Sequence, residues 1–241
     1  MILAIDIGNS RIKWGMHSNG GWLATGAADK NDLDALASAW KSGPSPGQII
    51  ASSVADPAIA AAVNAKLACW PVAPRWISAE AQQCGVSNGY RTPSQLGSDR
   101  WAALIAARRR TSAACLVVNC GTAMTVDALS ASGRFLGGLI VPGLSLMEQA
   151  LERGTEAIRL DGGDYQRFPD TTANAVRSGC LNALCGAVER MAYELSEAHG
   201  TPHCFLSGGN AQDVLPRLRI SAEVVDNLVL EGLIGIAHSC S

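Results

Sequence analysis

The chain has 241 residues, of which 48% are hydrophobic and 17% are charged, and its formal net charge is -2. This length and hydrophobic content suffice for one large α/β domain or for two lobes of ordinary size. A near-neutral balance with a pI of about 6.1 supplies no basic surface for a polyanion, which argues against nucleic acid as a partner.

The N-terminus and the cysteines bear on the compartment of the protein. The first residues are apolar up to Asp6 with no basic residue before it, and no run of about 18 uncharged apolar residues occurs. We therefore expect neither a signal peptide nor a membrane span. The eight cysteines form no CxxC pair, and the four histidines do not fall at zinc-ligand spacing beside them. Since a free thiol inside an apolar run behaves as a small hydrophobe, we expect a reduced, cytoplasmic protein.

The first half of the sequence predicts alternating strands and helices. Residues 1–8 form a short apolar run, and residues 11–28 continue with period-two alternation around a hairpin turn at Asn19, Gly20 and Gly21. Capping residues and the helical spacing of apolar residues mark helices farther along. We predict helices at 31–41, 57–70 and 98–110, strands at 47–54 and 75–80, and an irregular segment at 82–97.

The second half repeats the order of the first. Residues 113–143 predict a buried strand, a polar glycine turn, a returning strand, a Ser-Gly hairpin and a third strand, and AIDIGNSRIKWGM parallels VVNCGTAMTVDAL. Such a repeat predicts two lobes of related fold, residues 1–112 and 113–241. Later elements are expected as helices at 145–153 and 171–200, a strand at 203–209, and a strand or turn followed by a helix at 227–240.

Two common nucleotide-binding motifs are absent. The four lysines, at positions 13, 30, 41 and 66, never follow a glycine in a GK[ST] step, which excludes a P-loop. No GxGxxG occurs, which removes the ordinary dinucleotide fingerprint. A bound nucleotide must therefore be held by another geometry.

Three glycine turns, each following a buried strand, offer such a geometry. Asp6 precedes the turn at 8–10, and matching turns lie at 120–123 and 207–210. Glycine permits the close approach that a phosphate needs, and turn amides can donate hydrogen bonds to it. Taken singly, an Asp-x-Gly at a strand end is more often a structural turn. Their order and the repeat together favour nucleotide binding, with Asp6 placed to bind Mg²⁺ directly or through water.

A candidate proton acceptor lies at the start of the helix at 98–110. Phosphoryl transfer depends mainly on positioning and charge neutralisation, and a carboxylate can accept the proton of the attacking hydroxyl. Asp99 offers that carboxylate, and the guanidinium of Arg100 can grip a carboxylate or phosphate oxygen. The alternative is that Ser98 or Asp99 merely caps the helix while Arg100 pairs locally.

Six motifs, in this order and over nearly the whole chain, resemble those of the type III pantothenate kinases. This family is a branch of the acetate and sugar kinase/Hsc70/actin superfamily. The resemblance implies a two-lobed, actin-like (ribonuclease H-like) α/β fold, duplicated, each lobe a mixed β-sheet flanked by helices. The motifs are DIGNSRIKW at 6–14, YRTPSQLGSDRWAAL at 90–104, NCGTAMTVD at 119–127, GRFLGGLIVPG at 133–143, TTANAVRSG at 171–179 and LSGGNA at 206–211.

The resemblance also implies an activity and a set of site residues. The activity is ATP-dependent phosphorylation of pantothenate to 4′-phosphopantothenate, the first step towards coenzyme A. Asp99 resembles the catalytic proton acceptor, and Arg100 is a partner for the substrate carboxylate. The residues that match the ATP site are Asp6, Ile7, Gly8, Asn9, Ser10, Arg11, Ile12, Lys13 and Thr122. Those that match the pantothenate site are Tyr90, Gly97, Ser98, Asp99, Arg100 and Thr172.

One position departs from the family pattern. Many relatives have Asp where this chain has Asn119, and that carboxylate helps to hold an activating monovalent cation, K⁺ or NH₄⁺. An amide keeps the oxygen ligand but loses the negative charge. We therefore expect weak or absent dependence on either cation.

The resemblance further implies a homodimer whose substrate pocket is completed across the interface. The long helix expected at 171–200 is apolar enough to provide such an interface, although burial within one protomer would explain its composition equally well.

Two other readings of the sequence compete with this one. The first is another kinase of the superfamily that acts on a sugar or a short acid, although the chain is short for most sugar kinases. The second is a regulator that keeps the fold without catalysis. The presence of both Asp6 and Asp99 argues against a regulator, whereas the Asn119 departure keeps it open.

Overall fold

The chain folds into two compact units. A computed structural model describes residues 1–155 and 162–239. Unit 1 consists of Met1–Arg110 together with Asn227–Ser241, and unit 2 of Thr111–Asp226. The chain first passes from one unit to the other after Arg110, close to the boundary expected at residue 112. The prediction differs from the structure at the C-terminal segment, which was assigned to the second lobe and belongs to unit 1.

Unit 1 is built on a mixed five-stranded sheet in the order β3-β2-β1-β4-β5. The central strand β1 pairs antiparallel with β2 and parallel with β4. Asn19 and Gly20 both have positive φ, 51° and 79°, so the predicted hairpin turn joins β2 to β3. The strands are β1 (Ile2–Ile7), β2 (Arg11–Ser18), β3 (Gly21–Asp29), β4 (Gln48–Ser53) and β5 (Pro74–Trp76).

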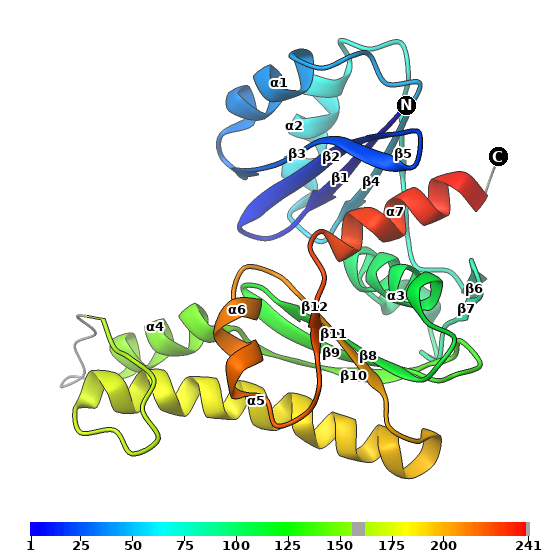
Figure 1. Ribbon diagram of the computed structural model, residues 1–241. Helices are drawn as coiled ribbons and strands as arrows, with labels where there is room; N and C mark the ends of the chain where they lie inside the picture. The colour runs from blue at the N-terminus through cyan, green and yellow to red at the C-terminus, as the bar shows by residue number, and fades with distance from the viewer. Residues whose placement is uncertain (156–161, 240–241) are drawn as a thin grey trace. The chain divides into compact units, whose positions relative to one another are not determined.

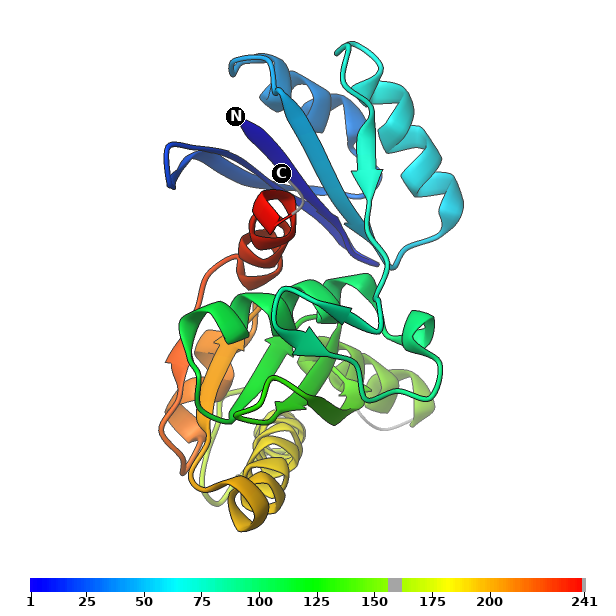
Figure 2. The same cartoon turned by 90° about the vertical axis from the view of Figure 1, so that its right-hand side faces the viewer.

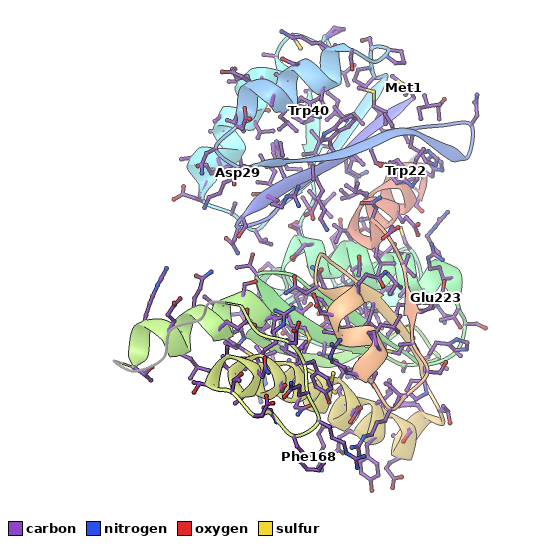
Figure 3. All side chains as sticks on the ribbon, turned by 60° about the vertical axis from the view of Figure 1, so that its left-hand side comes forward. Met1, Trp22, Asp29, Trp40, Phe168 and Glu223 are labelled. Carbon is purple, nitrogen blue, oxygen red and sulfur yellow. The ribbon has the colours of Figure 1, made fainter. Side chains whose placement is uncertain are left out.

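Helices α1 (Leu33–Lys41) and α2 (Pro57–Leu67) cover one face of this sheet (Figure 2). Each helix begins after an aspartate whose side chain accepts from a first-turn amide, Asp32 for α1 and Asp56 for α2. Trp40 is 1% exposed between α1 and the strands (Figure 3). The apolar side chains that close this layer come from alternate positions of β1, β2 and β4.

Two further helices complete unit 1. Helix α7 (Leu228–Ser239) packs against β1 and against α3 (Ser98–Arg110), which explains why the C-terminal segment belongs here. The two helices lie so close together that a Cβ on Gly232 would overlap the backbone carbonyl of Ala102. Glycine at this position therefore permits the contact. Between β5 and α3, the segment expected to be irregular contains the short hairpin β6 (Gln82–Gln83) and β7 (Val86–Ser87), followed by a 3₁₀ turn at Pro93–Gln95.

Unit 2 repeats the sheet of unit 1. Its strand order is β10-β9-β8-β11-β12, which matches β3-β2-β1-β4-β5 position by position (Figure 1). The internal repeat and the expected duplicated α/β fold are thereby confirmed. The strands are β8 (Cys115–Cys120), β9 (Ala123–Leu129), β10 (Phe135–Pro142), β11 (His203–Ser207) and β12 (Glu223–Val224).

One face of the second sheet is covered by its helices, of which α5 is the longest (Figure 1). The buried side chains of α5, such as Leu181, Leu184 and Val188, pack against β8 and β9. The apolar character of this helix is therefore largely used inside unit 2. The helices are α4 (Leu144–Gly154), α5 (Thr172–His199) and α6 (Ala211–Val214), with a 3₁₀ turn at Leu215–Arg217.

Two findings on the described residues concern the cysteines and the length of the apolar helices. All seven cysteines among them are free thiols, and the eighth, Cys240, lies outside the described residues. No helix in the described ranges combines the length and the apolar character needed to cross a bilayer.

Candidate active site

The carboxylate of Asp6 lies near the end of the central strand of unit 1. Strand β1 buries Ile5 and Ile7 against the layer of α1 and α2, so the alternation of the strand turns Asp6 to the opposite face. The hairpin to β2 follows at once and is closed by the Gly8 N–H, which donates to the Arg11 carbonyl oxygen at 3.0 Å. The first predicted glycine turn is therefore a tight connection with Asp6 at its base.

Two neighbouring strands supply partners to Asp6. On β4, the hydroxyl of Ser52 donates to Asp6 Oδ1 at 2.7 Å, and Ser52 is wholly buried. On β2, Lys13 is the register partner of Asp6. The carboxylate thus has a fixed hydrogen-bond donor on one side and a cation on the other.

The second carboxylate, Asp99, lies in the first turn of α3. The helix starts at Ser98, and the Trp101 N–H donates to the Gly97 carbonyl oxygen at 3.0 Å. Asp99 Oδ1 accepts from the Arg100 N–H at 2.8 Å. The Asp99 carboxylate therefore accepts from an amide of the first helical turn, the kind of contact that the capping alternative describes.

The hydroxyl of Ser98 contacts the backbone at the end of β4. Its Oγ accepts from the Ser53 N–H and donates to the Ser53 carbonyl oxygen, both at 3.2 Å. The residue is 7% exposed. Ser98 thus connects the start of α3 to the end of β4. Because β4 pairs with β1, this contact also fixes the position of Asp99 relative to Asp6.

The two carboxylates share a poorly solvated environment. The pKa of Asp6 is raised to about 6, mainly by burial and also by the charge of Asp99, against the lowering effects of the Ser52 hydrogen bond and of Lys13. Burial also raises the pKa of Asp99, opposed by the backbone N–H and the charge of Arg100. A carboxylate with a raised pKa is a better proton acceptor than an ordinary surface aspartate.

Arg100 and Tyr90, both predicted to contact substrate, are brought together. Arg100 is 6% exposed, and its Nη1 donates to the Tyr90 hydroxyl at 3.2 Å. The guanidinium carbon also lies 5.9 Å from the centroid of the Tyr90 ring. The loop is held by Asn88, whose Oδ1 accepts from the Tyr90 N–H and whose Nδ2 donates to the Pro93 carbonyl oxygen. A buried, braced guanidinium beside Asp99 is suited to binding an anionic group.

In unit 2, the two other predicted glycine turns meet. The Asn210 N–H donates to the Cys120 carbonyl oxygen at 3.1 Å, and the Gly143 N–H donates to the Thr122 carbonyl oxygen at 2.8 Å. A Cβ on Gly208, which has φ of 98°, would lie 2.6 Å from the Cys120 carbonyl oxygen. Glycine is required there by both backbone conformation and space.

The remaining predicted residues of unit 2 are Thr122, Asn119 and Thr172. Thr122 is exposed at the tip of the β8–β9 turn, and Asn119 is partly exposed at the end of β8. Thr172 is the exposed first residue of α5, next to Thr171, whose hydroxyl caps the helix. The predicted residues are therefore grouped as one set in unit 1, around Asp6 and Asp99, and another in unit 2.

Sequence reasoning missed the two serines that end β4. Ser52 contacts Asp6, and the backbone of Ser53 anchors Ser98. The available signal was a pair of small polar residues closing an otherwise apolar strand. If that strand lies parallel to β1, its end falls beside Asp6.

The donor set around Asp6 fits a magnesium ion that is bound together with a phosphate ligand. Within residues 1–155 and 162–239, no three His, Cys, Asp or Glu side chains are gathered to hold a metal by themselves. Mg²⁺ commonly takes only one or two carboxylates and completes its shell with waters and substrate phosphates. Asp6 provides a carboxylate of this kind, with a raised pKa that reflects its burial.

Comparison with known proteins gives a consistent result. A family model described as type III pantothenate kinase matches residues 2–194. The type III pantothenate kinase of Nitrosospira multiformis is 47% identical over 100% of this chain and 92% of its own length. That of Aromatoleum aromaticum is 47% identical over 99% and 98%.

A solved structure supports the fold. A Sinorhizobium meliloti protein provisionally named as a 2-dehydro-3-deoxygalactonokinase superposes with a TM-score of 0.66 at 14% identity, covering 100% of this chain and 99% of its own. At that identity the likeness concerns the fold alone, the two-lobed actin-like architecture of small-molecule kinases. Family model and relatives together are decisive: the chain belongs to the type III pantothenate kinase family.

Proposed function

We propose that this protein transfers the γ-phosphoryl group of ATP to the 4′-hydroxyl of pantothenate, giving ADP and 4′-phosphopantothenate, the first step of coenzyme A biosynthesis. The observation that carries the proposal is the pairing of a half-buried carboxylate, Asp99, with a buried guanidinium, Arg100, at the start of α3. Pantothenate offers one hydroxyl to be activated and one carboxylate to be bound. The two side chains match those two groups.

Asp99 is assigned as the proton acceptor. As the hydroxyl oxygen forms its bond to the γ-phosphorus and the bond to the ADP oxygen breaks, the hydroxyl proton passes to the Asp99 carboxylate. The raised pKa of Asp99 brings it closer to the pH at which the transfer occurs. The pantothenate carboxylate is assigned to Arg100 and Tyr90, which already hydrogen-bond to each other, with Gly97, Ser98 and Thr172 as further substrate-site residues.

ATP binding is assigned to residues 6–13 and to Thr122. Within the first set, Asp6 would hold Mg²⁺, directly or through water, and Lys13 adds a positive charge on the neighbouring strand. When bound, Mg²⁺ supplies neutralisation of the phosphate charge. The side chains of this chain contribute the orientation, through the hydrogen bond from Ser52 to Asp6.

A homodimer is part of the proposal. The edge strand β10 exposes Leu136, Leu139 and Ile140, the last at 63%, and the strand carries no charged side chain. An uncharged, apolar edge strand pairs readily with another chain unless it is covered. We assign this edge, rather than α5, to the contact between protomers, because the apolar residues of α5 are used within unit 2.

The direct test is ATP turnover by the purified protein with pantothenate, compared with a panel of sugars and short carboxylic acids. The proposal expects turnover with pantothenate and production of one ADP per 4′-phosphopantothenate. Turnover with a sugar or another acid alone would assign the chain to a different substrate. No turnover with any of them, together with retained nucleotide binding, would favour a regulator.

A further inference from the structure

Strand β4 ends in two buried hydroxyls with different surroundings. The Ser52 hydroxyl donates to Asp6 Oδ1 at 2.7 Å, and the residue has no exposed surface. The Oγ of Ser53, one residue later, is buried and has no hydrogen-bond partner among the described residues. The chain therefore contains a hydroxyl that contacts the carboxylate and an adjacent one that does not.

The position of Ser52 follows from the sheet. Strands β1 and β4 are parallel, and Asp6 is the register partner of Ser52. Side chains of register partners point to the same face of a sheet. Ser52 is wholly buried, so its side chain lies on the same face of the sheet as Asp6 and is shielded from bulk solvent.

The hydrogen bond from Ser52 occupies one of the two carboxylate oxygens of Asp6 and leaves the other available. A carboxylate accepts at both oxygens, and a donor held at one of them fixes the rotation of the group. Hydrogen bonds to an ionised acceptor are stronger than neutral ones. Oδ1 of Asp6 is thus committed to Ser52, which leaves Oδ2 as the oxygen for an incoming ligand.

A corresponding register pairing occurs in unit 2. There, Asn119 at the end of β8 is the register partner of Ser207 on the parallel strand β11, and Ser207 is 5% exposed. Ser207 is also preceded by apolar residues, as Ser52 is. A buried serine in an apolar strand costs free energy unless its hydroxyl is used. A buried serine therefore stands beside the polar strand-end residue in both sheets.

We propose that Ser52 is a positioning residue for the reaction: it holds Asp6 Oδ1 so that Oδ2 is presented to the Mg²⁺ that accompanies ATP. The inference rests on the proposed function, because it takes Asp6 as the carboxylate that binds the metal. A purely structural serine would affect folding alone. A positioning serine affects the part of nucleotide affinity that depends on Mg²⁺.

The experiment measures ATP binding by calorimetry with Mg²⁺ and with EDTA, for the parent, Ser52→Ala and Ser53→Ala. We expect Ser52→Ala to weaken binding about tenfold with Mg²⁺, the loss expected for a hydrogen bond to a charged group, and to leave binding in EDTA unchanged. Ser53→Ala, which removes a buried hydroxyl without a partner, should match the parent in both buffers. In kinetics, the KM for ATP should rise while the KM for pantothenate stays the same.

Three results would overturn the inference while leaving the proposed function intact. In the first, Ser52→Ala binds ATP with Mg²⁺ as tightly as the parent does. In the second, Ser52→Ala loses the same ATP affinity with Mg²⁺ as with EDTA. In the third, Ser53→Ala weakens ATP binding as much as Ser52→Ala does. If Ser52→Ala does not fold, Ser52→Cys decides, since its thiol is a weak donor of similar shape and should show the same Mg²⁺-dependent loss. A parent protein that binds ATP no better with Mg²⁺ than with EDTA would overturn both.

Discussion

Asp6 and Asn119 occupy equivalent positions in two sheets of the same strand order. Each is the next-to-last residue of its central strand, β1 or β8, and each is the register partner of a buried serine, Ser52 or Ser207. The geometry is duplicated, but the charge is not, because the acid of unit 1 corresponds to an amide in unit 2. The strand end of unit 1 is therefore suited to a divalent cation, whereas that of unit 2 offers only a neutral oxygen.

The first prediction concerns monovalent cations. An amide oxygen can coordinate K⁺ or NH₄⁺ but contributes no charge, so turnover should depend weakly or not at all on either cation. Turnover is measured in a buffer free of sodium and potassium, with and without added K⁺. Asn119→Asp should introduce a clear response to K⁺, because it restores the charge.

The control for this prediction is Asn64→Asp on the exposed side of α2, which adds the same charge elsewhere and should leave the response to K⁺ unaltered. Activity of the parent that collapses without K⁺ and returns when K⁺ is added would show that the prediction is wrong.

The second prediction concerns the proton acceptor. Asp99→Asn keeps the size of the side chain and removes its basicity, so kcat should fall roughly 10²–10⁴-fold while the affinity for ATP stays nearly unchanged. Both are measured, by steady-state assay and by calorimetry. Asp34→Asn is the matched control, since Asp34 pairs with Lys66 on the surface, and it should retain full turnover. A fully active Asp99→Asn protein would remove Asp99 from its assigned role.

The third prediction concerns the edge strand β10. Ile140→Glu places a charge on the exposed apolar edge of unit 2 and should shift the protein from dimer to monomer, as measured by light scattering after gel filtration. Leu23→Glu is the control, because Leu23 is similarly exposed, 59% against 63%, on β3, the corresponding edge strand of unit 1. A dimer that persists in Ile140→Glu and is lost in Leu23→Glu would assign the interface to the other edge.

Much of the fold was predictable because local chemistry dictates it. Asn19-Gly20 can take up positive φ at both positions, which is what a two-residue hairpin needs. Alternation along β1 and the aspartate caps of α1 and α2 are equally local. The place of α7 was not predictable from these signals. Its apolar residues suit either unit, and its packing against α3, β1 and β4 places it in unit 1.

The candidate site was predictable where a motif marks it and not where packing builds it. Asp6, Asp99 and Arg100 stand at recognisable strand or helix ends. Ser52 was missed because its importance depends on which strand becomes the parallel neighbour of β1, a pairing between residues 46 positions apart. For the same reason, the inward hydrogen bonds of Ser98 to Ser53 could not be foreseen from the motif that contains it.

The fourth prediction concerns the glycines of unit 2. Gly143 has an ordinary φ of -72°, yet a Cβ there would overlap the Gly121 carbonyl oxygen and lie 2.6 Å from that of Thr122. Gly143→Ala should therefore displace the β8–β9 turn, lower the free energy of unfolding by about 1–3 kcal/mol and weaken ATP binding. Denaturant unfolding and calorimetry measure the two effects.

Gly186 is the control position, because a Cβ there would meet no neighbouring atom. It lies on the exposed side of α5 with open space around its Cβ position, so Gly186→Ala should raise the free energy of unfolding by about 0.5–1 kcal/mol and leave ATP binding as it was. If Gly143→Ala behaves like Gly186→Ala, the turn tolerates a side chain and the steric argument is wrong.

The last prediction concerns pH and stability in unit 1. His17 on β2 makes edge contacts with Trp22 and His238, the latter on α7. Burial, the charge of His238 and the N-terminal amino group lower the pKa of His17 below its usual value of 6.5. The unfolded chain then binds the proton at a higher pH than the folded one, so the folded state loses stability as pH falls from about 7 through the usual range of histidine.

His17→Gln removes this titration and should make the thermal midpoint fall less between pH 7 and pH 5 than it does in the parent. The effect is read from midpoints measured by circular dichroism at half-unit steps of pH. His199→Gln, an exposed histidine at the end of α5, should keep the pH dependence of the parent. Trp22 loses its ring contact in the His17 variant, which lowers the thermal midpoint at every pH, including pH 8. The decisive quantity is therefore the slope of the thermal midpoint against pH. An unaltered slope in His17→Gln would show that His17 does not cause the acid sensitivity.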